Sequence, residues 1–314
     1  MLVRRFRLLF FLIFVAGGCE GTSVAHTDFG PASVVRNVLS SPDEALDYGR
    51  AKLAFDQIID PSLNVDATLA QVEQLAARAS ALAGANASPA AKLSALRRVI
   101  YQSGAWNDYR PFAYDLADPL GRNVRNKLVS SYLATRRGNC VSMPILLLIV
   151  AERMGLDLAL STAPLHIFLR YQDGEREINL EATSGGHPAR TLWYRQNLPM
   201  TDRAVESGLY MRTLTRREAV AHIASTVVDY LMIEGRFQEA IDVAQIILQH
   251  YPRDGYTMVK FGTAYAELMR VEYHERFPTP AMLPPGLRQR YAIFARQNER
   301  AFQAAEALGW EAPR

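Results

Sequence analysis

The chain has 314 residues, of which 35 are Lys or Arg and 32 are Asp or Glu, so its formal net charge is +3. Hydrophobic residues make up 49% of the chain, and only two cysteines are present. Three arginines and no acidic residues fall in the first 18 positions, so the remaining chain carries no net charge. This balance excludes the class of nucleic-acid-binding proteins that depend on a basic surface, and the hydrophobic content is ordinary for a globular protein.

The first 19 residues predict an export signal and a lipid anchor. Three arginines precede an apolar run at residues 8–15, which is too short for an ordinary membrane-spanning helix. The sequence Ala-Gly-Gly-Cys that ends at Cys19 resembles the lipobox of bacterial lipoproteins. We expect residues 1–18 to be removed and Cys19 to carry lipid, which would hold the protein to a membrane of the bacterial cell envelope, facing the periplasm or the exterior. A plain secretory signal or an uncleaved anchor is the alternative.

The next part of the chain predicts a tether followed by helices. Residues 19–44 are rich in polar and small residues with weak periodicity, so we expect a tether there. Apolar residues at helical spacing predict helices that cover a catalytic core, at residues 45–59, 67–82, 89–101 and 123–135. Between the last two lies an aromatic stretch that either lines a substrate groove or packs internally, and we favour packing: Trp106, Tyr109, Phe112 and Tyr114.

A single cysteine, Cys140, stands just before Pro144 and an apolar run. Proline is tolerated in a helix only in the first turn, so a buried helix is expected to begin at about residues 140–142. The N–H groups and the positive dipole end of that helix favour the thiolate form of cysteine and could supply part of an oxyanion hole. If Cys19 carries lipid, Cys140 has no disulfide partner, so it is either buried as a small apolar residue or kept for its chemistry.

Strands after this helix carry two further candidate residues. Residues 157–163 are strand-like and residues 166–171 alternate in polarity, and the hairpin signal Asp173-Gly174 predicts that residues 177–181 return as the next strand. His166 and Glu181 would be close if their side chains share a face of the sheet. Cys140 would then attack an acyl carbon, His166 would exchange the proton, and Glu181 would orient the imidazole. Taken singly, each residue has a simpler structural explanation, and the ordered set of three favours catalysis.

The rest of the chain predicts a connection and then helices. Residues 187–209 show little periodicity and contain His187, a rival base that is expected to lie off any strand. The later helices are expected at residues 219–233, 237–250, 255–269 and 287–308. Their lengths and breaks are typical of tetratricopeptide units, which either present a binding surface or form a packing cap. The sequence contains no phosphate loop, HExxH or paired CxxC, and we expect no metal or cofactor.

Three stretches resemble a known family: residues 136–142 (Arg-Arg-Gly-Asn-Cys-Val-Ser), 165–170 (Leu-His-Ile-Phe-Leu-Arg) and 179–186 (Asn-Leu-Glu-Ala-Thr-Ser-Gly-Gly). They are similar to the bacterial SirB-like branch of the transglutaminase-core superfamily. The likeness also includes residues 60–76 and the C-terminal helices. It implies a papain-like fold with a cysteine, histidine and acidic triad, and it assigns Cys140, His166 and Glu181 to the three positions, with Glu where Asp is usual.

We therefore expect an α+β protein with four parts: a signal at 1–18, a tether at 19–44, a papain-like transglutaminase-core domain with N-terminal helices at 45–210, and an all-α tetratricopeptide-like region at 211–314. Two functions stay open. The first is thiol-dependent acyl transfer on a peptide or protein substrate, where the resemblance favours hydrolysis of a peptide or amide bond over crosslinking. The second is a non-catalytic envelope scaffold that binds a protein partner through the C-terminal helices.

Overall fold

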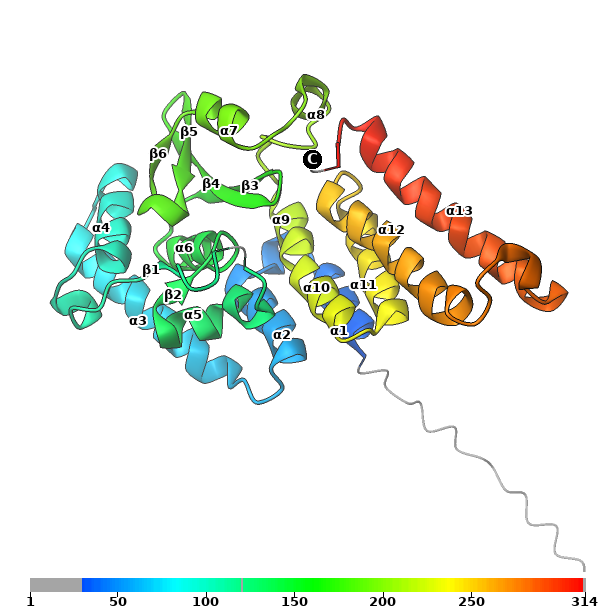
Figure 1. Cartoon of the computed structure of the whole chain (residues 1–314). Helices are drawn as coiled ribbons and strands as arrows, with labels where there is room; N and C mark the ends of the chain where they lie inside the picture. Colours follow the sequence, from blue (N-terminus) through cyan, green and yellow to red (C-terminus); the bar gives the residue numbers. More distant parts are fainter. Residues whose placement is uncertain (1–29, 120, 313–314) are drawn as a thin grey trace, which may run out of the picture.

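The computed structural model describes residues 30–119 and 121–312, so the expected signal and the expected lipidated Cys19 lie outside the described residues (Figure 1). Many helices and a small antiparallel sheet make up the structure, which confirms the α+β class (Figure 1). None of the helices in the described ranges combines the length and the apolar character that a membrane span requires.

The N-terminal segment folds into the helices α1 (Pro31–Leu39), α2 (Tyr48–Ile59), α3 (Val65–Ala83) and α4 (Pro89–Tyr101). The Ser88 side chain accepts a hydrogen bond from the Ala91 N–H at 3.2 Å and so caps α4 where the sequence predicts a helix start. Helix α1 corrects one expectation, because it lies within the segment that we expected to be an irregular tether. Val35 and Leu39 are buried in α1, which packs against α11 (Phe237–His250). Two such residues, one helical turn apart, are too few to reveal a helix from periodicity alone.

Helix α6 (Ser142–Arg153) is buried along almost its whole length. Every residue from 142 to 151 is buried, and α6 packs against α2, α3, α4 and α5 (Val129–Thr135) as well as the sheet. A helix that is apolar on all sides is stable in water only when neighbours cover it all round. The predicted helix at 123–135 is divided in two, because a 3₁₀ turn at Val124–Lys127 ends at Leu128 before α5 begins.

The strands form two sheets. The larger one is antiparallel, with neighbouring strands in chain order: β3 (Leu158–Ala163), β4 (His166–Asp173), β5 (Arg176–Glu181) and β6 (His187–Ala189). The smaller one pairs β1 (Ala113–Tyr114) with β2 (Arg137–Gly138) in parallel, directly before the Cys140 loop. The predicted strands are confirmed, and the sheet covers α6 through β3 and β4.

The segment that we expected to be a plain connection holds regular structure. It contains β6, α7 (Thr191–Asn197) and α8 (Asp202–Glu206). His187 therefore lies on a strand, where it pairs with Glu181, although we expected it off any strand. These elements have seven residues or fewer, which is too short for a hydrophobic period to be recognised.

The C-terminal part is helical throughout: α9 (Arg216–Ile223), α10 (Ser225–Ile233), α11, α12 (Gly255–Met269) and α13 (Pro285–Ala307). Consecutive helices from α10 to α13 pack against one another (Figure 1). A Cβ atom on Gly262 would lie 2.8 Å from a ring carbon of Phe302, so this glycine allows α12 and α13 to approach closely. Whether these helices are tetratricopeptide repeats stays a prediction.

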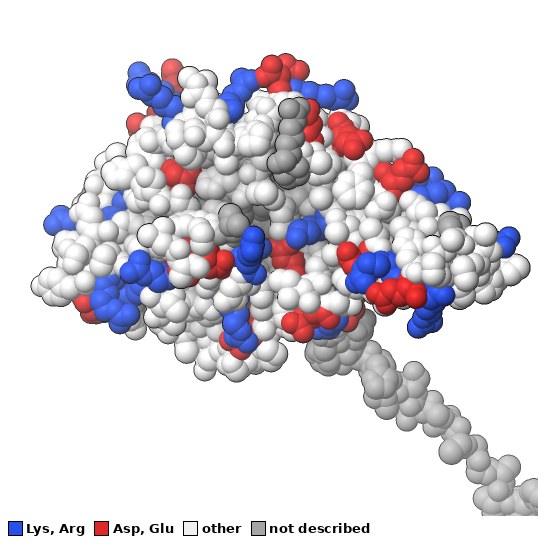
Figure 2. Space-filling model, in the orientation of Figure 1, with Lys and Arg blue, Asp and Glu red and all other residues white. Residues whose placement is uncertain are grey.

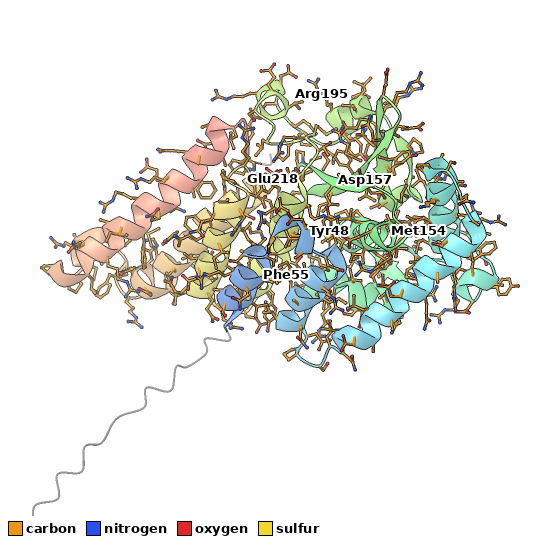
Figure 3. All side chains as sticks on the ribbon, turned by 180° about the vertical axis from the view of Figure 1, so that it is seen from behind. Tyr48, Phe55, Met154, Asp157, Arg195 and Glu218 are labelled. Carbon is orange, nitrogen blue, oxygen red and sulfur yellow. The ribbon has the colours of Figure 1, made fainter. Side chains whose placement is uncertain are left out.

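One hydrophobic cluster extends from the N-terminal helices through α6 and the sheet into the C-terminal helices. Tyr48 and Phe55 of α2 belong to it and lie near the middle of the molecule, between the C-terminal helices and Met154 at the end of α6 (Figure 3). The described charged side chains on the face in Figure 2 are of interspersed sign, in keeping with the balanced charge of the sequence.

Candidate functional site

Cys140 lies in the turn between β2 and α6 and is partly exposed. The turn is tightly packed, because a Cβ atom on Gly138 would lie 2.6 Å from the Tyr132 ring and 2.7 Å from the Ser142 hydroxyl oxygen. Glycine is therefore required two residues before the cysteine, where the strand comes closest to its neighbours. The chain thus presents the thiol from a rigid position at the start of the central helix.

Asn139 holds this turn in place. Its side-chain oxygen accepts hydrogen bonds from the N–H groups of Val141 at 2.9 Å and Ser142 at 3.1 Å, and its main-chain oxygen accepts from Met143 at 3.1 Å. The free helix N–H groups expected to face the sulfur are therefore occupied. Among the described residues no acceptor binds the N–H of Cys140 itself, so this group is the remaining main-chain donor for an oxyanion hole.

His166 begins β4 and Glu181 ends β5, and the strand register brings them together. Leu169 pairs with Leu180, which places Glu181 beside Phe168, two residues along β4 from His166 and on the same face. The Nε2 atom of His166 lies 2.8 Å from the Oε2 atom of Glu181. The predicted contact across the hairpin is therefore present in the structure.

Glu181 is 5% exposed and is held by several donors. It accepts hydrogen bonds from the Thr183 N–H at 3.0 Å, the Thr183 hydroxyl at 2.5 Å and the Tyr194 hydroxyl at 2.9 Å. Burial alone would raise the pKa of Glu181, but His166 and Thr183 outweigh it and lower the pKa. The carboxylate is therefore ionised and fixed in orientation.

The sulfur of Cys140 lies against the start of β4, where its thiol donates to the Leu165 carbonyl oxygen at 3.7 Å. Burial lowers the pKa of His166, but interactions with Cys140 and Glu181 are stronger in sum and raise it to about 9. These contacts favour the charged imidazolium form of His166. Since Glu181 binds Nε2, Nδ1 is the ring nitrogen left for proton exchange with the sulfur.

The other sequence candidates lie elsewhere or have structural roles. Phe112 is 3% exposed and packs on the Tyr132 ring, so packing is the role of this aromatic residue. Tyr114, unlike Phe112, neighbours the candidate nucleophile: burial, and after it the neighbouring Cys140, raise the pKa of Tyr114. The Arg136 guanidinium donates to two main-chain oxygens and stacks on the Phe112 ring. His187 is bound to Arg97 at 2.5 Å.

Sequence reasoning missed three residues that fix the site: Asn139, Thr183 and Tyr194. Asn139 has a recognisable signal, because an Asn side chain in a turn commonly accepts hydrogen bonds from the main-chain N–H groups that follow it. Thr183 follows Glu181 by two residues in a turn that the glutamate caps. Tyr194 is fully buried and stacks on Phe168 with ring centroids 4.3 Å apart, but it lies on the short α7, for which the sequence gives no signal.

Comparisons with known proteins find a family and two relatives that are similar to part of the chain. Residues 66–220 match the family model of the transglutaminase-like superfamily. Protein SirB1 of Salmonella typhimurium and Protein SirB1 of Salmonella typhi are each 26% identical to the chain over 182 residues. The match covers 56% of this chain and 64% of either relative, and no solved structure matches the chain. The family-model match includes Cys140, His166 and Glu181, so residues 66–220 form a transglutaminase-like domain, in a chain that is similar to Protein SirB1.

Proposed function

We propose that this protein is a thiol-dependent acyl-transfer enzyme that acts on peptide or amide bonds, with Cys140 as nucleophile, His166 as general acid and base, and Glu181 as the residue that orients His166. The observation that carries the proposal is the 2.8 Å contact between His166 and the buried carboxylate of Glu181, next to the Cys140 sulfur. A core histidine with only a structural role needs no neighbouring thiol. Covalent catalysis, in contrast, uses a nucleophile in contact with a base, and an acid that orients the base.

The reaction follows from these positions. The Cys140 thiolate forms a bond to the acyl carbon, and the carbonyl electrons move to oxygen, where the Cys140 N–H stabilises the charge. The carbon–nitrogen bond then breaks, and the His166 imidazolium gives its proton to the leaving amine, which yields a thioester. Water or an amine attacks the thioester while neutral His166 takes a proton from it, and the thiolate leaves. The family resemblance favours water, and thus hydrolysis, and none of these steps requires a cofactor.

Location is part of the proposal. The lipobox-like sequence at Cys19 supports a lipid anchor in the bacterial cell envelope, with the enzyme facing the periplasm or the exterior and a peptide or protein as its substrate.

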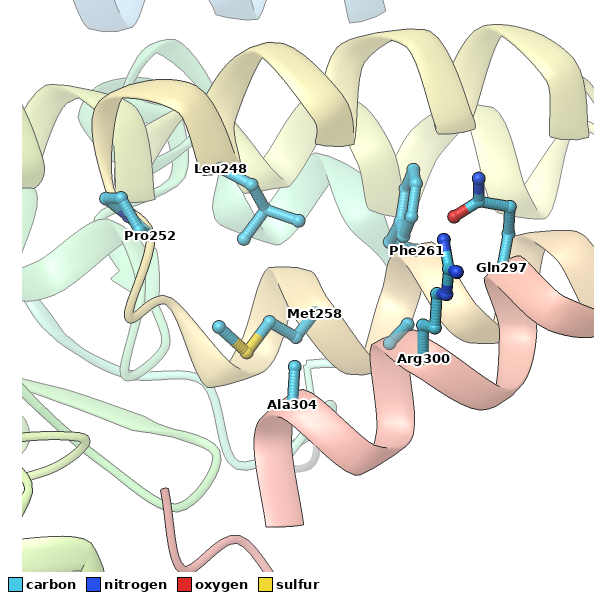
Figure 4. Close-up of a pocket in the computed structure, with 8 residues that line it drawn as sticks. Leu248, Pro252, Met258, Phe261, Gln297, Arg300 and Ala304 are labelled. Carbon is cyan, nitrogen blue, oxygen red and sulfur yellow. The ribbon is translucent and has the colours of Figure 1, made fainter. Parts of the chain in front are cut away.

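A second candidate function is binding of a protein partner without catalysis. A groove of about 230 Å³ between α11, α12 and α13 favours it (Figure 4). The groove is mainly apolar, with Arg300 and Gln297 among the side chains that line it. Such a groove could hold an apolar peptide segment, and this function does not require a reactive Cys140.

An activated ester tests the proposed enzyme without knowledge of its substrate. The protein is mixed with p-nitrophenyl acetate, nitrophenolate release is followed, and the Cys140 peptide is examined by mass spectrometry for an acetyl group. We expect an acetylated Cys140 and a loss of release of about 10²-fold or more in His166→Ala. His187→Ala is the matched control and should behave like the wild type. Release that is equal in wild type and Cys140→Ala would contradict the proposal and favour the scaffold function.

A further inference from the structure

Leu165 occupies a position next to both reacting groups. It is the second residue of the two-residue loop between β3 and β4, since Ala163 pairs with His166 across that loop. Its carbonyl oxygen accepts the Cys140 thiol at 3.7 Å, and the next residue is the base, His166. A substrate that reaches the sulfur therefore passes close to this residue.

Two features of Leu165 are unfavourable in the free protein. Its φ angle is 54°, in the left-handed region that suits Gly or Asn and that leucine rarely adopts. The preceding residue is Pro164, and a turn with proline first and a positive φ second normally has Gly or Asn at the second position. The leucine side chain is also 71% exposed, and it belongs to neither hydrophobic cluster of the described residues. Strained backbone of this kind gathers at ligand and catalytic sites.

A second exposed leucine lies on the other chain segment that adjoins the Cys140 loop. Leu116 is 82% exposed and follows β1. The preceding N–H, of Asp115, donates to the Gly138 carbonyl oxygen at 2.7 Å, two residues before the cysteine. A single exposed leucine on a protein surface would need no explanation. Here large exposed apolar side chains come from both chain segments next to the nucleophile.

We infer that Leu165 is a specificity-determining residue, part of an apolar subsite that receives a bulky apolar group next to the scissile bond of the acyl substrate. The inference rests on the proposed function and narrows its substrate class to peptides or amides with such a group. Substrate binding covers the exposed leucine, and the apolar surface removed from water offsets the strain of the loop. A glycine or asparagine here would relieve the strain but would offer the substrate no apolar contact.

A pair of alkylating probes tests this subsite. Iodoacetamide and N-hexyl-iodoacetamide carry the same reactive group, and mass spectrometry of the Cys140 peptide in the full-length protein gives the rate for each. For Cys140, the rate with the hexyl probe is divided by the rate with iodoacetamide. This ratio is then divided by the same ratio measured for glutathione, which corrects for the intrinsic reactivity of the two probes and gives the corrected ratio. Each covered methylene favours the hexyl probe by up to about fourfold, so we expect a corrected ratio of about ten or more in the wild type.

Leu165→Asn should lower the corrected ratio to within about twofold of one, because asparagine has a similar size and no apolar end. Ile233→Asn is the matched control, since Ile233 is 61% exposed at the end of α10, and it should keep the wild-type ratio. Leu165→Asn should also raise the thermal midpoint, because asparagine tolerates a positive φ. A wild-type ratio near one, or a high ratio that Leu165→Asn leaves unchanged, would overturn the assignment.

The two claims fail separately. The corrected ratio can be read at any absolute rate, so a ratio near one contradicts the apolar subsite even if Cys140 reacts quickly. A slow reaction with plain iodoacetamide that does not depend on His166 contradicts the proposed function instead, whatever the ratio.

Discussion

The Tyr194 hydroxyl donates to Oε2 of Glu181 at 2.9 Å, and the same oxygen contacts His166 Nε2 at 2.8 Å. A single carboxylate oxygen therefore links the predicted base to a fully buried tyrosine. The carboxylate cannot turn away from His166 without losing both partners.

Tyr194→Phe removes one donor from a buried carboxylate. Hydrogen bonds to charged groups contribute roughly 1.5–3 kcal/mol, so we expect the free energy of unfolding at pH 7 to fall by about that amount. Urea denaturation followed by circular dichroism measures it. Tyr210→Phe is the control, because no hydrogen bond of the Tyr210 hydroxyl is present among the described residues, and it should change stability far less. Equal effects of both substitutions would show that Tyr194 acts by packing alone.

The raised pKa of His166 makes stability depend on pH. The folded pKa of about 9 lies above the ordinary value of 6.5, so the charged histidine stabilises the fold fully below pH 6.5. That stabilisation is lost as the pH rises through 9, and its upper bound is of the order of 3 kcal/mol for this buried side chain. Urea titrations at several pH values should show the decrease in the wild type and in His187→Ala.

Glu181→Gln should make this pH profile less steep, because the neutral amide no longer favours the imidazolium, while the contribution of Cys140 remains. The free energy of unfolding would then fall less between pH 6.5 and 9 than it does in the wild type. A profile as steep as that of the wild type would mean that Glu181 does not hold the charge on His166.

A buried ion pair gives a prediction about the scaffold. Lys52 and Asp56 on α2 have fully buried side chains 2.7 Å apart, and Asp56 also accepts the Val129 N–H at 2.9 Å, at the start of α5. Lys52→Met alone leaves an unpaired buried carboxylate and should cost about 3–5 kcal/mol. Adding Asp56→Asn should restore most of the stability, since the amide oxygen still accepts the Val129 N–H. A double variant as unstable as the single one would contradict this account, and thermal denaturation decides it.

The site could be predicted in advance because its three main residues lie on elements with strong local signals. Pro144 marks the start of α6, and the alternating pattern and the hairpin place His166 and Glu181 on paired strands. The strand register, which the structure supplies, puts them on one face. The groups that hold these residues could not be predicted as readily. Tyr194 comes from a seven-residue helix, and its contact with Glu181 depends on how α7 folds back over the sheet.

The fold, too, contains some elements that the sequence predicts and others that it does not. Long periodic helices such as α3 and α4 follow from the sequence, because their apolar positions recur over several turns. Helix α1 does not, because so short a segment is stable only through its packing against other helices, chiefly α11 and also α2 and α9. The occupied N–H groups after Cys140 also could not be foreseen, since they depend on the side-chain conformation of Asn139.

The most direct test of the central claim is the rate of iodoacetamide alkylation at Cys140 as a function of pH, in the wild type and in His166→Ala. The account predicts fast alkylation at pH 6–7 and a decrease of about tenfold or more in His166→Ala, because the imidazolium stabilises the reactive thiolate. A rate that rises only above about pH 8, as for a free cysteine, and that is the same in both proteins would contradict it.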